Sequence, residues 1–391
     1  MKFKAVLLLF FVFAFTSFSQ KKNNRELKHV TLSGSGYELG LQHGSLLKSE
    51  IAEIVSKWKQ NTTQTFQKDS DSIVSDFFKY AHFTEAIKKW TPELYEEIRG
   101  IADGSGQDFN DIFILNLLDE FWVYIDDLSN HHCSDVGVAS VNGSPSYIAQ
   151  NMDIETYTDG YQTLITLQRH DNKPEQLILT HPGLIALNGM NENGVGVVVN
   201  TIMQLKASSE GLPVAFVIRR IINSTDKEDL LTFIQSVNHA SGQNYIIGIR
   251  GEVYDFEASA NEVVRYDPKN KNGTVYHTNH PIVNTDVKAW YKNYNPNLKD
   301  ESLPRASNSY VRLDALKSRM LNKFTINDEI IKEALRSKDN EKHPVCNSNT
   351  ENAFGFTFAS VVMTLTETPY LQITAGPPDE SEFTRIDFSK K

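Results

Sequence analysis

The chain has 391 residues, of which 40% are hydrophobic and 23% are charged, and its formal net charge is −10. This composition is typical of a folded protein with a sizeable core, and the length allows one large domain or two ordinary ones. The acidic balance excludes a broad basic surface of the kind that binds nucleic acid, so no nucleic-acid partner is expected.

The first segment has the pattern of a secretory signal peptide. Two lysines precede an unbroken apolar run from residue 5 to residue 15, and Ser17 and Ser19 provide a small-residue cleavage site. The run is too short to span a bilayer comfortably, which favours a removed signal over a membrane anchor. We therefore expect residues 1–19 to be a signal peptide, with no stable membrane anchor and a secreted or periplasmic location.

Residues 20–132 are expected to form a helical N-terminal segment. After a polar stretch, apolar residues recur at helical spacing from about His29 onward. Thr91 and Pro92 mark a helix start, with Thr91 as the N-cap and Pro92 in the first helical position. Residues 109–124 form one further amphipathic helix in this interpretation.

The pattern changes at Cys133, where a strand-rich body of residues 133–391 begins. Asn142-Gly143 is a hairpin signal between two strands that follow Cys133. Further strands are expected at 164–168, 176–180, 196–201, 245–249, 252–256, 263–266, 356–365 and 370–374, and helices at 214–222, 227–237 and 324–335. This order predicts an α+β fold in which antiparallel sheets carry helices on their outer faces.

The chain has two cysteines, Cys133 and Cys346. In an oxidising compartment, their number alone favours one disulfide. Cys133, however, lies where a helical segment ends and a strand begins, in the sequence Asn-His-His-Cys-Ser-Asp. A free catalytic thiol at Cys133 is therefore the preferred interpretation, a buried core thiol is the alternative, and Cys346 is assigned no role.

A cysteine that opens a strand can become a nucleophile if the peptide bond before it is cut. Cleavage between His132 and Cys133 would give Cys133 a free α-amine with a pKa of about 8, which can serve as the base for its own thiol. Such a site also needs a carboxylate to hold the amine and a donor for the oxyanion. Asp153, one hairpin away, and Asn279, after a downstream strand-like run, are the candidates, although Asp153 as a turn cap and Asn279 as a loop partner are alternatives.

Several segments, taken in order, resemble the N-terminal-nucleophile hydrolases of the peptidase C45 group, which includes acyl-coenzyme A:6-aminopenicillanic acid acyltransferase and is related to the choloylglycine hydrolases. The matching segments are GYELGLQHG from Gly36, ELYEEIRGIADGSGQDFNDIFILNLLDE from Glu93, the Cys133 strand, QNMD, HPGLIALNGMNENGVGVVVNT, LPVAFVIRRI, HTNHP, and FASVVMTL followed by AGPP. They span about residues 29–378, and their ordered succession carries the resemblance.

The resemblance implies a four-layer αββα sandwich with Cys133 as the nucleophile that forms a thioester. It implies that Asp153 positions the amine and that Asn279 belongs to the oxyanion hole. It also implies that Asn200 lines the oxyanion site and, from a looser motif, that Arg312 binds substrate.

The activity implied is that of an amidohydrolase or acyltransferase acting on linear amides, with a small N-acyl compound as substrate and no cofactor. Hydrolysis is favoured, because acyl-coenzyme A is scarce outside the cytoplasm. The two chains left by self-cleavage, 20–132 and 133–391, would stay associated.

Two positions depart from the family pattern. His132 precedes the nucleophile where a small residue is expected, which predicts either slower cleavage of the bond or assistance from His132. Gln150 stands where the bile-salt relatives carry an arginine, which weakens a bile-salt assignment.

Two other functions fit the sequence. A papain-like hydrolase would pair Cys133 with His277 or His280 and would remain uncut, and a catalytically inactive binding protein would keep the fold with an uncut chain. Two histidines without a matching carboxylate pattern are weak evidence for a metal, so no metal site is expected.

Overall fold

The computed structural model of the chain describes residues 25–125, 132–171, 173–268, 270, 273–293, 304–351 and 353–390, without the side chains of 304–307. The expected signal peptide, residues 1–19, lies outside these residues. None of the described helices is long and apolar enough to cross a membrane.

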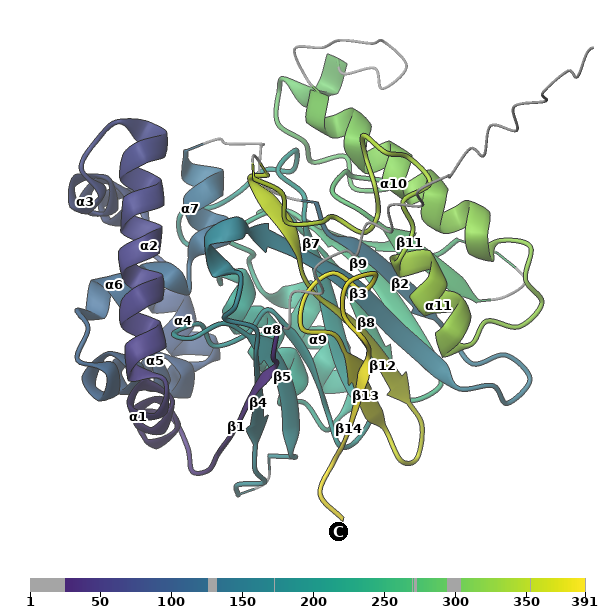
Figure 1. Cartoon of the computed structure of the whole chain (residues 1–391), viewed down its shortest axis with the longest axis horizontal. Helices are drawn as coiled ribbons and strands as arrows, with labels where there is room; N and C mark the ends of the chain where they lie inside the picture. Colours follow the sequence, from purple (N-terminus) through teal and green to yellow (C-terminus); the bar gives the residue numbers. More distant parts are fainter. Residues whose placement is uncertain are drawn as a thin grey trace, which may run out of the picture.

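Two sheets lie face to face at the centre of the molecule (Figure 1). The first has the order β1 (Lys28–Leu32), β4 (Thr163–Leu167), β5 (Gln176–Thr180), β6 (Asn188–Asn191), β7 (Val195–Thr201), β8 (Gln243–Ile249), β9 (Glu252–Ala258) and β10 (Val263–Tyr266). The second has the order β11 (Thr274–His277), β2 (Ser134–Val138), β3 (Ser146–Glu155), β12 (Gly355–Leu365), β13 (Tyr370–Ile373) and β14 (Thr384–Asp387). Strands β2 and β3 pack against β7, β8 and β9 across the interface.

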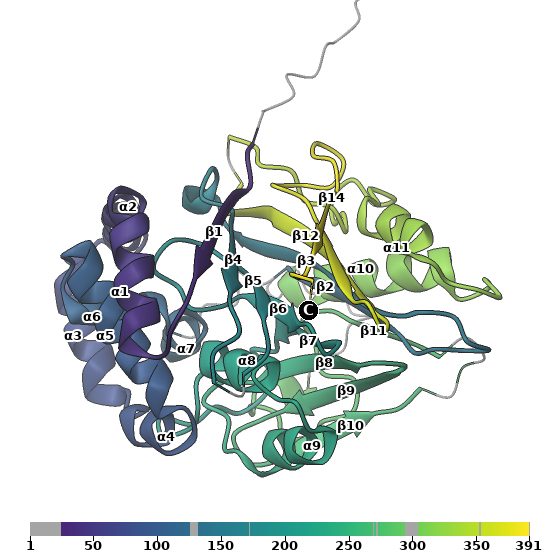
Figure 2. The same cartoon turned by 90° about the horizontal axis from the view of Figure 1, so that it is seen from below.

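Helices cover the outer face of each sheet (Figures 1 and 2). Helix α8 (Val214–Ile222) packs on β6 and β7, with α9 (Lys227–Ser236) beside it. Helix α10 (Pro304–Met320) packs on β11, and α11 (Asp328–Leu335) packs on β3 and β12. The expected α+β fold with four αββα layers is therefore confirmed.

The N-terminal helices form a further group beside the sandwich, on the side of β1 and β4 (Figure 2). They are α1 (Tyr37–Leu46), α2 (Lys48–Phe66), α3 (Ser70–Tyr80), α4 (Thr84–Trp90), α5 (Pro92–Ser105), α6 (Phe109–Leu115) and α7 (Leu118–Tyr124). Helices α1 and α5 cross in backbone contact, since a Cβ at Gly40 would lie 1.8 Å from the carbonyl oxygen of Glu97 and one at Gly100 would lie 2.2 Å from that of Tyr37. Only glycine fits such a crossing, which explains the glycine pattern of both segments.

Three expectations for this segment need correction. The stretch from His29 begins as a strand, because β1 pairs in parallel with β4 and so extends the first sheet. Residues 109–124 are two helices, because the side chain of Asn116 donates to the carbonyl oxygens of Ile112 and Gly183 and interrupts the helix there. Pro92 begins α5 and Thr91 occupies the N-cap position as expected, but the Thr91 hydroxyl donates back to the carbonyl oxygen of Ile87 at 3.2 Å and makes no capping hydrogen bond.

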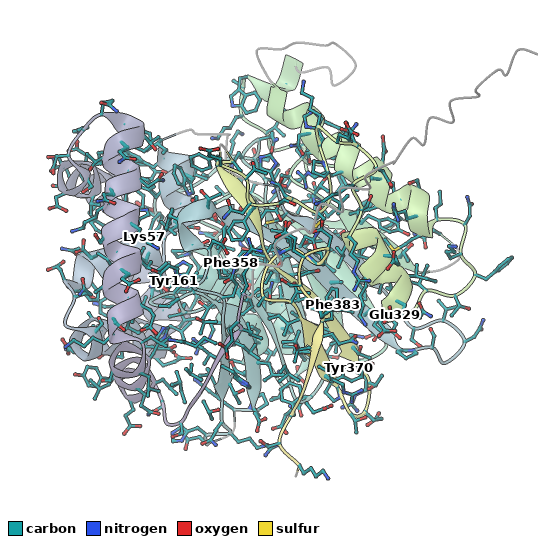
Figure 3. All side chains as sticks on the ribbon, viewed as in Figure 1. Lys57, Tyr161, Glu329, Phe358, Tyr370 and Phe383 are labelled. Carbon is teal, nitrogen blue, oxygen red and sulfur yellow. The ribbon has the colours of Figure 1, made fainter. Side chains whose placement is uncertain are left out.

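Polar contacts attach the N-terminal helices to the sandwich. Lys57 on α2 lies beside Tyr161, and its ammonium donates to the tyrosine hydroxyl at 2.9 Å (Figure 3). Deeper inside, Glu97 on α5 and Arg219 on α8 form an ion pair at 2.7 Å in which each side chain is only 3% exposed. The segment before Cys133 is thus built into the same folded body as the sheets.

Candidate active site

Cys133 is the residue immediately before β2. It is 6% exposed, and both Cys133 and Cys346 are free thiols, so the disulfide alternative is wrong. Asn142 and Gly143 adopt the positive φ angles of 54° and 79° that a tight hairpin requires, which brings β3 alongside β2 as expected. The Sγ atom of Cys133 lies 3.7 Å from Sδ of Met152 and 3.8 Å from the carbonyl oxygen of Asp153, both on β3.

Arg312 binds the peptide bond that precedes the thiol. Its side chain projects from α10 and is 1% exposed. Its Nη1 donates to the carbonyl oxygen of His132 at 2.7 Å, to that of Cys133 at 2.5 Å and to the hydroxyl of Ser134 at 3.0 Å. Arg312 is not among the residues that line the pocket described below, so its contacts are with the chain around Cys133.

Asn308 completes this arrangement and was not identified from the sequence. Its Oδ1 accepts a hydrogen bond from Nε of Arg312 at 2.5 Å, and its Nδ2 lies 3.0 Å from Nδ1 of His132. Asn308 and Arg312 are four residues apart on α10, so the spacing would have revealed the pair had the helix been recognised.

Asn279 lies in the same cluster, with its amide orientation fixed. Its Oδ1 accepts from Nη2 of Arg312 at 3.0 Å, and its Nδ2 donates to the carbonyl oxygen of Thr201 at 3.0 Å. Only one orientation of the amide satisfies both contacts. Because an amide carries two N–H donors and one is shown bound, the other can serve an incoming oxyanion.

Asp153 on β3 is a buried carboxylate with one bound oxygen and one orphaned oxygen. Its Oδ1 accepts from the Thr357 hydroxyl at 2.7 Å, while its Oδ2 has no hydrogen-bond partner. Burial raises the pKa of Asp153 to about 7, although Thr357 and the charge of Arg312 act in the opposite direction. The carboxyl group therefore exchanges its proton near neutral pH.

The thiol of Cys133 is not activated in the uncut chain. Burial, followed by the charges of Asp153 and Asp135, raises its pKa well above the usual value. Burial also lowers the pKa of Arg312 to about 10, yet the guanidinium stays protonated at neutral pH. The thiol thus needs a base beside it, and Asp153 is the titrating group nearest neutrality there.

Asn200 occupies β7 between Val199 and Thr201, which both line the pocket beside Cys133. Asn200 itself is not among the lining residues, because successive side chains of a strand point to opposite faces. Its side chain is fully buried, and neither Oδ1 nor Nδ2 has a hydrogen-bond partner. Such an orphaned amide is costly, so it calls for a specific explanation.

A pocket opens beside Cys133, between helices α6, α7 and α8 and strands β3 and β7. Its apolar wall consists of Leu115, Leu118, Trp122, Met152, Ile154, Leu184, Ala186, Leu187, Val199, Val214, Ala215 and Ile218. Its polar lining consists of Asn116, Asp119, Cys133, Asp153, Glu155, His181 and Thr201. The helices before Cys133 therefore contribute to a groove that reaches the thiol as well as to the core.

The two histidines of the papain-like alternative are committed elsewhere. Nδ1 of His277 contacts the carbonyl oxygen of Thr278 at 2.5 Å, and its Nε2 contacts Glu257 at 2.8 Å. His280 contacts the Ser309 hydroxyl at 2.6 Å through Nδ1 and stacks on Tyr310. Burial lowers the pKa of His280 well below its usual value. Groups of three or more potential metal ligands are absent from the described residues.

The family model described as acyl-coenzyme A:6-aminopenicillanic acid acyl-transferase matches residues 140–380, more than half of the chain. The chain belongs to this family. Its members are acyltransferases and amidases of the N-terminal-nucleophile type. A curated relative from Emericella nidulans, the acyl-coenzyme A:6-aminopenicillanic-acid-acyltransferase 40 kDa form, is 26% identical over 327 residues, which are 83% of this chain and 85% of that protein.

Solved structures are also similar. A mutant conjugated bile acid hydrolase from Clostridium perfringens superimposes with a TM-score of 0.42 at 17% identity, over 66% of this chain and 93% of that one. The penicillin V acylase from Agrobacterium tumefaciens superimposes with a TM-score of 0.41 at 14% identity, over 66% of this chain and 87% of that one.

Proposed function

We propose that this member of the family cuts its own chain between His132 and Cys133 and then hydrolyses N-acyl amides with an apolar acyl group. The observation that carries the proposal is a pair of hydrogen bonds from Arg312. One reaches the carbonyl oxygen of His132, which belongs to the bond to be cut, and the other reaches the carbonyl oxygen of Cys133. A cation on the carbonyl oxygen of His132 stabilises the negative charge that develops there when the neighbouring thiol attacks.

Self-cleavage proceeds by an N-to-S shift. Asp153 takes the thiol proton, and Sγ of Cys133 attacks the carbonyl carbon of His132. The C–N bond then breaks as Asp153 returns that proton to the nitrogen, which leaves a thioester and a free α-amine on Cys133. Water hydrolyses the thioester, which restores the thiol and releases the carboxylate of His132 together with a proton that the α-amine takes up. Oδ2 of Asp153, which has no hydrogen-bond partner, is the acceptor that we propose for the new ammonium.

Amide hydrolysis uses the same atoms. The α-amine of Cys133 takes the proton of its own thiol, and Sγ attacks the carbonyl of the substrate. The second N–H of Asn279 and the amide of Asn200, which has no hydrogen-bond partner, are the oxyanion donors that the family resemblance implies. The amine returns the proton to the leaving group, and water hydrolyses the thioester on Cys133.

The pocket supports an apolar acyl group. Twelve of its lining residues are apolar, and they come from helices α6 to α8 as well as from the sheets. An acyl chain that fills such a groove gains about 0.8 kcal/mol for each buried methylene group.

The charge of the pocket supports a neutral or cationic substrate. The carboxylates Asp119 and Glu155 line it, together with Asp153, which is partly ionised near its pKa of about 7. Its histidine, His181, is neutral because burial lowers the pKa to about 4. Asp119 accepts hydrogen bonds from Thr201 at 2.9 Å and from Gln243 at 3.0 Å, which hold it at the pocket without neutralising it. A carboxylate or sulfonate on the substrate would meet like charge there.

We also propose, from the sequence of residues 1–19, that the protein acts outside the cytoplasm and that its two chains stay together. Hydrolysis fits this location better than transfer from acyl-coenzyme A. The parallel pairing of β1 with β4 and the Glu97–Arg219 ion pair, which both join the part before Cys133 to the part after it, support the association.

The function can be tested with para-nitroanilides of acetic, hexanoic and decanoic acid. The self-cleaved protein is expected to release para-nitroaniline with a kcat/KM that rises with acyl length, and quenched samples should carry the acyl mass on the chain that begins at Cys133. Cys133→Ala should abolish both signals, and release that persists in Cys133→Ala would refute the proposal. N-hexanoylglycine should be hydrolysed at least tenfold less efficiently than N-hexanoylglycinamide, which differs only in its charge.

A further inference from the structure

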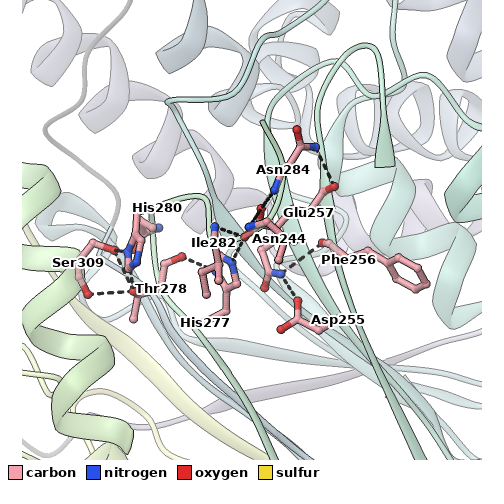
Figure 4. A network of polar contacts seen from close by, with 12 residues as sticks. Asn244, Asp255, Phe256, Glu257, His277, Thr278, His280, Ile282, Asn284 and Ser309 are labelled. Atoms are coloured by element: carbon pink, nitrogen blue, oxygen red, sulfur yellow. Dashed lines mark hydrogen bonds and ion pairs between the residues drawn. The ribbon is translucent and has the colours of Figure 1, made fainter. Parts of the chain in front are cut away.

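Glu257 on β9 is a fully buried carboxylate that receives four hydrogen bonds (Figure 4). Its Oε1 accepts from Nε2 of His277 at 2.8 Å and from the backbone N–H of Ile282 at 2.5 Å. Its Oε2 accepts from the backbone N–H groups of Val283 at 3.0 Å and Asn284 at 2.7 Å. Two donors on each oxygen satisfy the carboxylate, so it fixes every group that it touches.

These contacts close a short loop at both ends. His277 is the last residue of β11, and Ile282, Val283 and Asn284 follow five to seven residues later. The side chain of Asn284 also donates to the backbone carbonyl of Glu257 at 3.1 Å. The segment between the two attachment points contains Asn279, the expected donor to the oxyanion.

The contact between His277 and Glu257 is an ion pair. Its Nδ1 faces the carbonyl oxygen of Thr278 and its Nε2 faces Glu257, so both nitrogens act as donors and the ring carries a positive charge (Figure 4). Burial alone would lower the pKa of His277, but the hydrogen bond and charge of Glu257, with the charge of Asp255, raise it above the usual value. The same contact keeps the pKa of Glu257 below its usual value against the effect of burial.

We propose that Glu257 and His277 are positioning residues that hold the loop of Asn279 in the geometry required for oxyanion binding, an inference that rests on the proposed function. Neither contacts the thiol or lines the pocket, so they act through the loop. Glu257 accepts one hydrogen bond from His277 and three from the backbone of the loop. These bonds confine the loop more tightly than an apolar contact of the same size would, because each hydrogen bond has a required direction. An oxyanion donor must be placed in advance to be effective.

The test is a kcat and KM comparison on fully self-cleaved enzyme. In Glu257→Gln, the side-chain NH2 faces either the N–H donors of Val283 and Asn284 or those of His277 and Ile282. Two donors lose their acceptor in either orientation, so the loop must move. We expect kcat to fall 10- to 100-fold with KM changed less than threefold. His277→Gln provides a second variant, with the same expectation, should Glu257→Gln not fold.

A double-mutant cycle with Asn279→Ala shows whether the effect passes through that residue. Glu257→Gln should lower kcat by less than threefold when Asn279 is already alanine. Independent effects that multiply would overturn the proposal. Full activity of Asn279→Ala alone would instead refute the oxyanion role of Asn279, and so the proposed function.

Glu97→Gln is the matched control, because Glu97 is also a buried carboxylate in an ion pair but contacts Arg219 and not the Asn279 loop. It should lower the melting temperature and leave kcat within twofold of wild type. If Glu257→Gln lowers the melting temperature equally and kcat no more than Glu97→Gln does, the role of Glu257 is structural and the inference fails.

Discussion

Arg312 is the residue whose contacts bear most directly on the proposed self-cleavage. A planar guanidinium with five N–H donors can bind the carbonyl oxygens of His132 and Cys133 together with Asn279 and Asn308, whereas a lysine ammonium has three donors and no fixed plane. We expect Arg312→Met to leave the chain uncut and Arg312→Lys to slow the cut by at least tenfold, as measured by gel electrophoresis over time.

Arg319 provides the control for this prediction. It lies on the same helix, α10, but its side chain is 35% exposed and pairs with Asp339. Arg319→Met should be cut as fast as wild type. If Arg312→Met folds, as judged by its melting curve, and is still cut at the normal rate, then Arg312 does not stabilise the attacked carbonyl.

The buried carboxyl group of Asp153 is expected to lower the free energy of unfolding as the pH rises. Its pKa is about 7 in the folded chain and about 4 in an unfolded one, so the folded state holds the proton more strongly and stability is lost as the pH rises from about 4 through 7. In the uncut Cys133→Ala background, Asp153→Asn should therefore raise the free energy of unfolding by about 2 kcal/mol more at pH 8 than at pH 5.

Urea denaturation at the two pH values measures this difference. Asp71→Asn, a change of the same kind on a carboxylate that is 72% exposed, should show no such dependence on pH. An equal effect of Asp153→Asn at both pH values would mean that Asp153 does not titrate between pH 5 and pH 8 and so could not exchange a proton near neutrality.

At the scale of elements, the crossing of α1 and α5 leaves no room for a side chain. A methyl group at Gly40 would overlap the carbonyl oxygen of Glu97 at 1.8 Å, so the helices would have to separate. Gly40→Ala is expected to destabilise the fold by about 3 kcal/mol or more, because overpacking against rigid backbone cannot be relieved by a side-chain movement. Ser45→Ala, at an exposed position of α1, should change the melting temperature little, and equal melting curves for the two variants would contradict the close crossing.

The elements also show what the sequence can and cannot reveal. Strands β2, β3 and β12 were predictable because β-branched runs and the Asn142-Gly143 turn act locally. Strand β1 was missed because its place is determined by pairing with β4, about 130 residues away. The break at Asn116 was missed for a similar reason, since its partners Gly183 and Ile185 belong to a distant loop.

The site also contains residues that local sequence patterns predict and residues that only the structure reveals. A local change of pattern and family motifs predicted Cys133, Asp153 and Asn279, and the structure links all three through contacts around Cys133 and Arg312. Helix α10 was not identified, so Asn308 and the full set of contacts of Arg312 could only come from the structure. The contacts of Glu257 are not encoded locally either, because they join β9 to the loop after β11.

At the scale of the whole molecule, cutting before Cys133 should not separate the two parts. Strand β1 remains an edge strand of the first sheet, the Glu97–Arg219 ion pair stays buried, and a continuous hydrophobic core spans the N-terminal helices and both sheets. Obligate contacts of this kind do not dissociate in water. We expect one peak containing both fragments in native size-exclusion chromatography and separate fragments only in denaturant. Separate peaks under native conditions would contradict this expectation.

The proposed function requires Cys133 to become the N-terminal residue of the working enzyme. Intact-mass analysis of the purified wild-type protein and of Cys133→Ala, with N-terminal sequencing of any fragment, measures this. We expect two wild-type fragments, of which the larger begins at Cys133, and a single uncut chain for Cys133→Ala. A single uncut species in the wild type would refute the proposed function.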